Sequence, residues 1–158
     1  MKETDTAYKI FQKAYEKQLE GKVDEAIDLY KTSISLCPTA EAHTFLGWAY
    51  SLNGEYREAI SECILAIDLD PDYGNPYNDI GSYLISLDQY DEAITWLHKA
   101  IKAERYEPRH YPFFNIGRAY EMKGLWLEAR EYYYKALDIK PGFEQARTAV
   151  IKLTSYMN

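Results

Sequence analysis

Residues 113–141 read FFNIGRAYEMKGLWLEAREYYYKALDIKP, and this stretch decides the fold. Its apolar residues recur at spacings of three and four on both sides of Gly124, which is the period of an amphipathic helix. A glycine just past the end of a helix adopts the left-handed conformation, and Pro141 cannot continue a helix. The stretch therefore predicts a helix, a short turn and a second helix.

The same pattern occurs four times along the chain. Alanines at intervals of 33, 34 and 36 residues mark the four copies: Ala26, Ala59, Ala93 and Ala129. Small residues also lie twelve positions before and seven positions after these alanines: Ala14, Gly47, Gly81, Gly117, Ser33, Ala66, Ala100 and Ala136. Turn residues and prolines keep the same phase: Gly21, Gly54, Asp88, Gly124, Pro38, Pro71 and Pro141. Because these registers move together, the sequence predicts four helical hairpins in a row.

At these residues the chain resembles the tetratricopeptide repeat family, whose signature places Gly, Tyr, Ala, an aromatic residue and Pro at fixed spacings. The fourth copy carries most of that signature: Phe113, Ile116, Gly117, Tyr120, Ala129, Tyr133 and Pro141. The second copy reads Leu46, Gly47, Tyr50, Ala59, Cys63 and Pro71. The resemblance implies an all-α fold, a right-handed α-solenoid of four helix-turn-helix repeats plus a C-terminal capping helix. No single repeat buries its apolar face alone, so the repeats must stack.

We expect a polar lead at residues 1–6, repeats at 7–39, 40–73, 74–109 and 110–141, and the capping helix at 142–158. Lys13 and Lys17 replace apolar residues of the signature, which is expected on the solvent-facing side of a terminal repeat. One apolar stripe is predicted to face inward from the capping helix: Phe143, Ala146, Val150, Leu153 and Tyr156.

The connection between the third and fourth repeats is two residues longer than in the usual pattern. One interpretation is a longer surface turn. The other is that this locally basic stretch of an acidic chain receives an acidic partner segment. The basic residues of the stretch are His98, Lys99, Lys102, Arg105, Arg109 and His110.

Composition narrows the functional classes. The 18 Lys and Arg residues against 25 Asp and Glu residues give a net charge of -7, which disfavours binding to nucleic acid or an anionic membrane. An aromatic content of 15% argues against disorder. The polar N-terminus, the lack of an apolar run long enough to span a membrane, and the presence of only two cysteines, Cys37 and Cys63, lead us to expect a cytoplasmic protein.

The sequence offers no catalytic constellation. The three histidines are far apart, no Cys/His cluster has metal-ligand spacing, and no glycine-rich loop is suited to phosphate. Cys63 occupies a core position of its repeat, and no base lies near Cys37 in the sequence. We therefore expect no catalytic residue, no metal site and no cofactor. A composite active site would require a metal or ligand held by His98, His110 or Asp79.

In the family that this chain resembles, the first helices of successive repeats line a concave face that binds proteins or peptides. The resemblance places these residues in that groove: Tyr8, Phe11, Tyr15, Thr44, Trp48, Asn75, Asn78, Asp79, Ser82, Tyr111, Asn115 and Arg118. Trp48, Asn78 and Arg118 are expected to be exposed, with Trp48 as an apolar anchor and Arg118 as the partner of an acidic group. Phe11 is equally well interpreted as a core residue.

Two further possibilities concern partners. The family's carboxylate clamp for chaperone C-termini needs cations that the matching positions lack, and Asp79 would repel a carboxylate. The chain is therefore not expected to be a chaperone cofactor of the clamp type. A homo-oligomeric adaptor is the alternative function, because part of the Tyr132-Tyr133-Tyr134 run must face outward from a helix.

Overall fold

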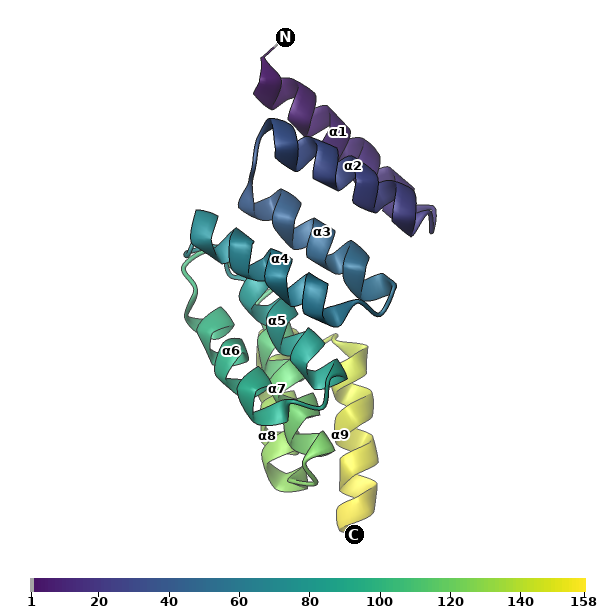
Figure 1. Cartoon of the computed structure of the whole chain (residues 1–158). Coiled ribbons are helices and arrows are strands. Elements are labelled where there is room, and N and C mark those ends of the chain that lie inside the picture. The colour runs from purple at the N-terminus through teal and green to yellow at the C-terminus, as the bar shows by residue number, and fades with distance from the viewer. Residues whose placement is uncertain (1) are drawn as a thin grey trace.

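The computed structural model describes residues 2–158, and in that range the chain forms nine helices and no strand (Figure 1). The helices are α1 (Glu3–Leu19), α2 (Val23–Leu36), α3 (Ala40–Leu52), α4 (Tyr56–Leu69), α5 (Asn75–Ser86), α6 (Tyr90–Lys102), α7 (His110–Met122), α8 (Trp126–Ile139) and α9 (Glu144–Met157). Each odd-numbered helix from α1 to α7 packs most extensively on the helix that follows it, and the hairpins stack in chain order. The predicted all-α solenoid is confirmed.

The hairpin turns use the residues that the sequence pattern singled out. Gly21, Gly54 and Gly124 have φ values of 79°, 75° and 75°. Asp88 takes the same left-handed conformation at φ 59°, and its carboxylate accepts a hydrogen bond from the Tyr90 hydroxyl at 2.8 Å. A side chain is tolerated at this turn because aspartate, unlike bulkier residues, enters the left-handed region at modest cost.

Small residues lie where the two helices of a hairpin cross. A Cβ added to Gly81 would lie 2.4 Å from Cγ of Leu97, and one added to Gly117 would lie 2.6 Å from the ring of Tyr133. Leu97 and Tyr133 are both fully buried. The glycines therefore let large core side chains of the second helix reach the backbone of the first.

Both ends of the chain depart from the sequence-based expectations. Residues 3–6, which were expected in a polar lead, belong to α1. Glu3 and Asp5 stabilise the start of this helix because their negative charges lie near the positive end of the helix dipole. Met1 lies outside the described residues. Lys13 is exposed, but Lys17 is half-buried and pairs with Glu20 and Glu25 at 3.7 and 3.5 Å.

The inward stripe of α9 is confirmed except at its end. Phe143, Ala146, Val150 and Leu153 are buried, but Tyr156 is 56% exposed. The last turn of α9 reaches the start of α8. There the ring of Tyr156 contacts the exposed ring of Trp126, with ring centroids 5.6 Å apart.

The long connection between α6 and α7 is fastened to the turn before α5. The Gly74 amide donates to the Arg105 carbonyl at 2.8 Å, and the Arg105 amide donates to the Asp72 carbonyl at 3.0 Å. The Arg105 guanidinium also pairs with Asp70. Tyr106 is buried against Gly74, where any Cβ would lie 2.4 Å from the Cβ of Tyr106. The extra residues therefore form a packed structural element.

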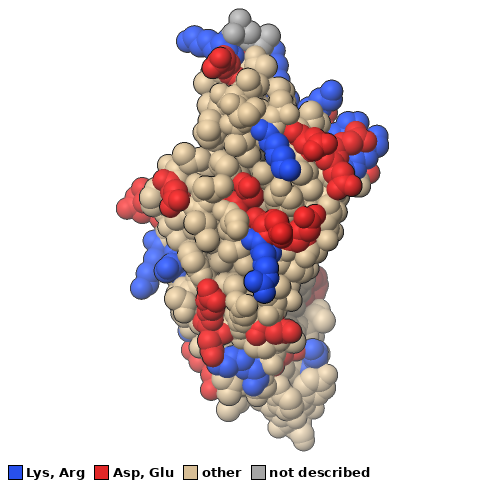
Figure 2. Space-filling model, viewed as in Figure 1, with Lys and Arg blue, Asp and Glu red and all other residues tan. Residues whose placement is uncertain are grey.

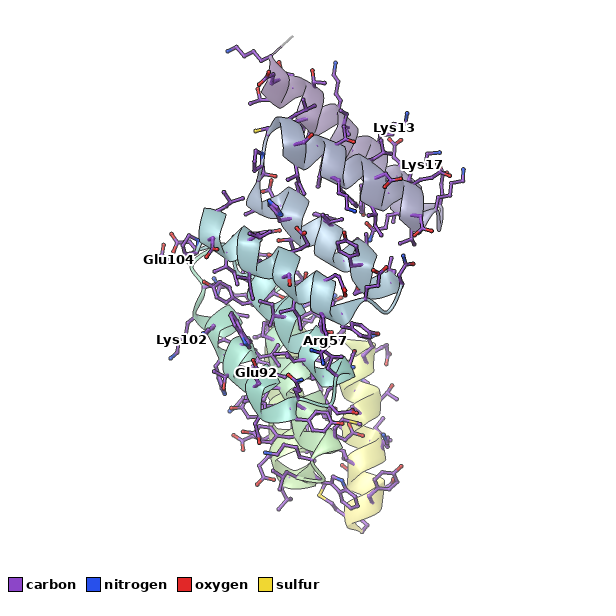
Figure 3. All side chains as sticks on the ribbon, viewed as in Figure 1. Lys13, Lys17, Arg57, Glu92, Lys102 and Glu104 are labelled. Carbon is purple, nitrogen blue, oxygen red and sulfur yellow. The ribbon has the colours of Figure 1, made fainter. Side chains whose placement is uncertain are left out.

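This packing uses much of the basic stretch internally. Arg109 donates to the carbonyls of Ile101, Ala103 and Glu104 at 3.3, 3.1 and 3.1 Å, which satisfies the end of α6. His110 is buried between the rings of Tyr111 and Phe143. Lys102 and Glu104 extend from the outer edge of the molecule (Figure 3). Arg105 and Arg109 thus bind groups of the chain, which supports the structural interpretation for these two residues, whereas Lys99 and Lys102 stay exposed.

Candidate binding groove

The first helices of three hairpins, α3, α5 and α7, build a groove with a volume of about 540 Å³. The helices that line it are neighbours, since α5 packs directly on both α3 and α7. Nine of the groove residues expected from the sequence line it: Thr44, Trp48, Asn75, Asn78, Asp79, Ser82, Tyr111, Asn115 and Arg118. The alternation of inner and outer helices is what gathers these side chains on one face.

Trp48 forms the apolar end of the groove. Its ring lies 5.9 Å from that of Phe45 and 6.4 Å from that of Tyr15, and the side chain is 36% exposed. Phe45 also contacts Phe11, with ring centroids 5.1 Å apart. Trp48 therefore packs on a cluster of tilted and edge-to-face aromatic rings and offers part of its surface to the groove.

The three expected residues from α1 lie outside this groove. Tyr8 and Phe11 line a separate pocket of about 230 Å³ near Cys37, and the ring of Tyr15 contacts the ring of Trp48. Phe11 also packs on the fully buried Tyr30 at 5.7 Å. Phe11 is thus tied to the core, whereas Tyr8 and Tyr15 stay exposed.

A row of hydrogen bonds crosses from α5 to α7 at the groove floor. The Asn115 amide donates to the Asn78 side-chain oxygen at 3.0 Å, and Arg118 donates to the Asn115 oxygen at 3.1 Å. Asn78 and Asn115 are 8% and 6% exposed, so the expected exposure of Asn78 is wrong. Asn78 is buried because its partner amide comes from the next hairpin, a pairing that no local sequence pattern reveals.

Thr44 is likewise buried, and its hydroxyl donates to the Ala40 carbonyl of its own helix at 2.7 Å. Arg118 is half-buried, and its charge helps to lower the pKa of the neighbouring Glu121 carboxyl, although the largest influence there, burial, raises it. Arg118 is therefore engaged within the protein at Asn115, while Glu121 is bonded to Lys152 and Tyr133.

Asp79 is the acidic residue in the lining of the groove, and its pKa is strongly raised. Burial raises its pKa from the ordinary value of 3.8 to about 7, and a hydrogen bond with the Asn78 side chain only partly offsets this. Asp79 is half-buried, and part of the residue stays accessible from the groove. Near neutral pH, Asp79 is therefore poised between its neutral and charged forms.

Three tyrosines that the sequence did not single out complete the groove around Asp79. Tyr73, Tyr83 and Tyr106 all line the groove, and for each one burial raises the hydroxyl pKa while the charge of Asp79 raises it further. Tyr73 and Tyr106 come from the two segments joined by the backbone bonds of Gly74 and Arg105. The extra length of the α6–α7 connection was the one sequence signal that could have located Tyr106.

Metal-ligating and thiol side chains elsewhere in residues 2–158 were the other candidates for a site. Within residues 2–158, no group of three His, Cys, Asp or Glu side chains is arranged to hold a metal ion. Burial raises the pKa of the Cys63 thiol, so this cysteine stays protonated. None of the helices described for the chain has the length and apolarity needed to cross a membrane.

Comparison with known proteins agrees with the helical-repeat fold. Tetratricopeptide repeat models match residues 40–73 and 72–141. Human tetratricopeptide repeat protein 29 is 32% identical over 122 residues, covering 73% of this chain and 24% of the relative. The chain spans about a quarter of the length of the curated relatives it matches.

Two solved structures illustrate the likeness of the fold. Pseudomonas aeruginosa PilF superposes with a TM-score of 0.90 at 20% identity, covering 99% of this chain and 71% of PilF. The first TPR domain of Spaghetti (RPAP3), solved with the HSP90 peptide SRMEEVD, superposes with a TM-score of 0.69 at 21% identity, covering 75% of this chain and 94% of that domain. Together with the matched models, these findings show that the chain belongs to the tetratricopeptide repeat family.

Proposed function

We propose that this chain is a non-catalytic scaffold that binds a protein or peptide segment in the groove of α3, α5 and α7. The observation that carries the proposal is the groove itself, which combines the exposed ring of Trp48 with the polar row of Asn78, Asn115 and Arg118. Proteins of this family are generally scaffolds, and the Spaghetti (RPAP3) domain of similar fold was solved with a peptide.

The two parts of the groove suit different parts of a ligand. An aromatic ring fixed in place gives a large contact area at a small entropic cost, which is typical of residues that dominate binding energy. Side-chain amides pair with backbone groups of an extended segment, and Asn75, half-buried at the groove edge, is available for this. Tyr111, which is exposed, extends the same surface.

The ligand is proposed not to be a chaperone C-terminal carboxylate. In the register that starts at the first hairpin, the five clamp positions hold Phe11, Tyr15, Phe45, Asn75 and Asp79. The register that starts at the second hairpin holds Thr44, Trp48, Asp79, Tyr111 and Asn115. Neither set includes a cation, so a carboxylate would meet Asp79 without compensation.

Replacing both Trp48 and Arg118 with Ala is expected to abolish capture of the partner from the source cell. The change removes the apolar anchor and the arginine of the groove lining, both of which keep surface accessible to a ligand. Affinity capture with wild type and the double variant, followed by mass spectrometry, makes the comparison. The unfolding free energy should fall by about 1 to 2 kcal/mol, because both side chains are only partly buried.

A matched control is Trp126→Ala together with Arg130→Ala, which changes a tryptophan and an arginine on the outer helix α8 and should leave capture intact. Undiminished capture by the Trp48/Arg118 variant would contradict the proposed groove. A large loss of stability in that variant would show that these side chains belong to the core.

Self-assembly is the second candidate function, and exposed aromatic surface on α8 favours it. Tyr133 is fully buried, but the next residue, Tyr134, is 49% exposed. In the view of Figure 2, acidic and basic side chains are interspersed among uncharged ones. Light scattering at two concentrations should reveal a dimer in wild type that Tyr134→Glu disrupts. A monomer at both concentrations would contradict self-assembly.

A further inference from the structure

The carboxylate of Asp79 lacks a cationic partner among the described residues. None of the ion pairs formed within residues 2–158 involves Asp79. Its one described side-chain partner is the neutral amide of Asn78. A half-buried carboxylate without a countercharge is costly, so its presence in a groove needs an explanation.

The nearby cations are committed elsewhere. Arg118, which lines the same groove, donates to the Asn115 side chain and forms no ion pair with Asp79. Arg105 is paired with Asp70 on the connection beside the groove. The part of the protein that the structure describes thus supplies no side chain to neutralise Asp79, and a ligand entering the groove would be the first cation to meet it.

The surroundings of Asp79 favour a cation over other ligand groups. Tyr73, Tyr83 and Tyr106 line the groove around it, and Trp48 lies at the apolar end. Aromatic ring faces attract Lys and Arg side chains, and a carboxylate adds a direct ion pair. An acidic group would be repelled, and an apolar group would leave the carboxylate buried and unpaired.

We infer that the groove recognises a partner segment through a lysine or arginine side chain, which enters the groove beside Tyr73 and Tyr106 and pairs with Asp79. This inference rests on the proposed function and specifies the chemistry of its ligand. The rest of the segment would follow the polar row towards Arg118, so a basic residue at Asp79 and an acidic or polar residue nearer Arg118 fit the groove together.

The test uses four acetylated and amidated tripeptides, Gly-X-Gly, with X as Lys, Arg, norleucine or Glu. Each is titrated into the full chain labelled with ¹⁵N, and binding is followed by amide chemical shifts near Asp79, Tyr73 and Tyr106. The Lys and Arg peptides should bind about fivefold or more tightly than the norleucine peptide, and the Glu peptide should bind least. Asp79→Asn should remove this preference, whereas Asp138→Asn, an exposed carboxylate on α8, should keep it.

A second measurement needs no variant. The carboxyl ¹³C shift of Asp79, followed in wild type at fixed pH, should move towards the charged form when the Lys or Arg peptide is added, and should not move with norleucine. Equal binding of all four peptides, preference for Glu, or no binding of any of them would overturn the inference. The proposed function would then still be decided separately, by partner capture with the Trp48/Arg118 variant.

Discussion

Leu97→Ala is expected to lower the unfolding free energy by about 3 kcal/mol, because it removes a fully buried side chain from the crossing of α5 and α6. Gly81→Ala is expected to cost about 2 kcal/mol for the opposite reason, since the new Cβ would lie 2.4 Å from Cγ of Leu97. These two changes act on the same space from opposite sides. Urea denaturation followed by far-UV circular dichroism measures each loss.

The double variant, Gly81→Ala with Leu97→Ala, tests whether the two changes act on the same space. The methyl group introduced by Gly81→Ala would occupy part of the cavity that Leu97→Ala creates, so the combined loss should be smaller than the sum by about 1 to 2 kcal/mol. Gly142→Ala is the matched control, because a Cβ there meets nothing within 4 Å, and its effect should be close to zero. Additive losses at positions 81 and 97 would contradict the close crossing on which the hairpin depends.

Asp79→Asn is expected to stabilise the chain, and the gain should depend on pH. An acid whose pKa is raised by folding costs no stability below its unfolded-state pKa, here 3.8, and a growing amount as the pH rises to its folded value of about 7. Above that value the cost is constant. The full difference corresponds to roughly 4 kcal/mol, and we expect about 2 kcal/mol because Asp79 keeps some accessible surface.

The measurement compares urea denaturation of wild type and Asp79→Asn at about pH 4 and about pH 8. The groups coupled to Asp79, namely Cys63, Tyr73, Tyr83 and Tyr106, all have raised pKa values and stay neutral across this range. The variant should therefore gain over wild type only at the higher pH. A difference that is the same at both pH values would show that the Asp79 carboxyl is solvated like an ordinary surface acid.

This cost is informative about function. A residue that lowers stability and lies in a groove, away from the helix crossings, is typical of a binding site, where stability is given up for recognition. The pH-dependent stability of Asp79→Asn and the peptide-binding test are two independent measurements on Asp79. The first requires only the folded chain, and the second requires a ligand.

The fold was predictable because the same pattern of small, apolar and turn residues recurs in each hairpin. Gly81 and Leu97 lie a fixed distance apart in the sequence, and every copy places a small residue opposite a larger one at the same helix crossing. The inner face was predictable for the same reason, and Trp48 and Asp79 indeed line the groove. Local periodicity determines which helix face points inward.

The rest depended on contacts between segments far apart in the sequence. Asn78 is buried by Asn115, which lies 37 residues later, and the short-range pattern gives no sign of that pairing. Tyr106 enters the groove only because the backbone of Arg105 bonds to the turn at residues 72–74. The conformation of an irregular connection is set by such partners, and repeat phase does not specify them.

The fastening of Arg105 to Asp72 and Gly74 has a kinetic consequence. Tyr73 and Tyr106 are held in place before any ligand arrives, so association does not have to order that wall of the receptacle, and little conformational entropy is lost there. Capture should then proceed as a single bimolecular step whose rate rises linearly with ligand concentration, without the plateau that a slow closing motion would impose.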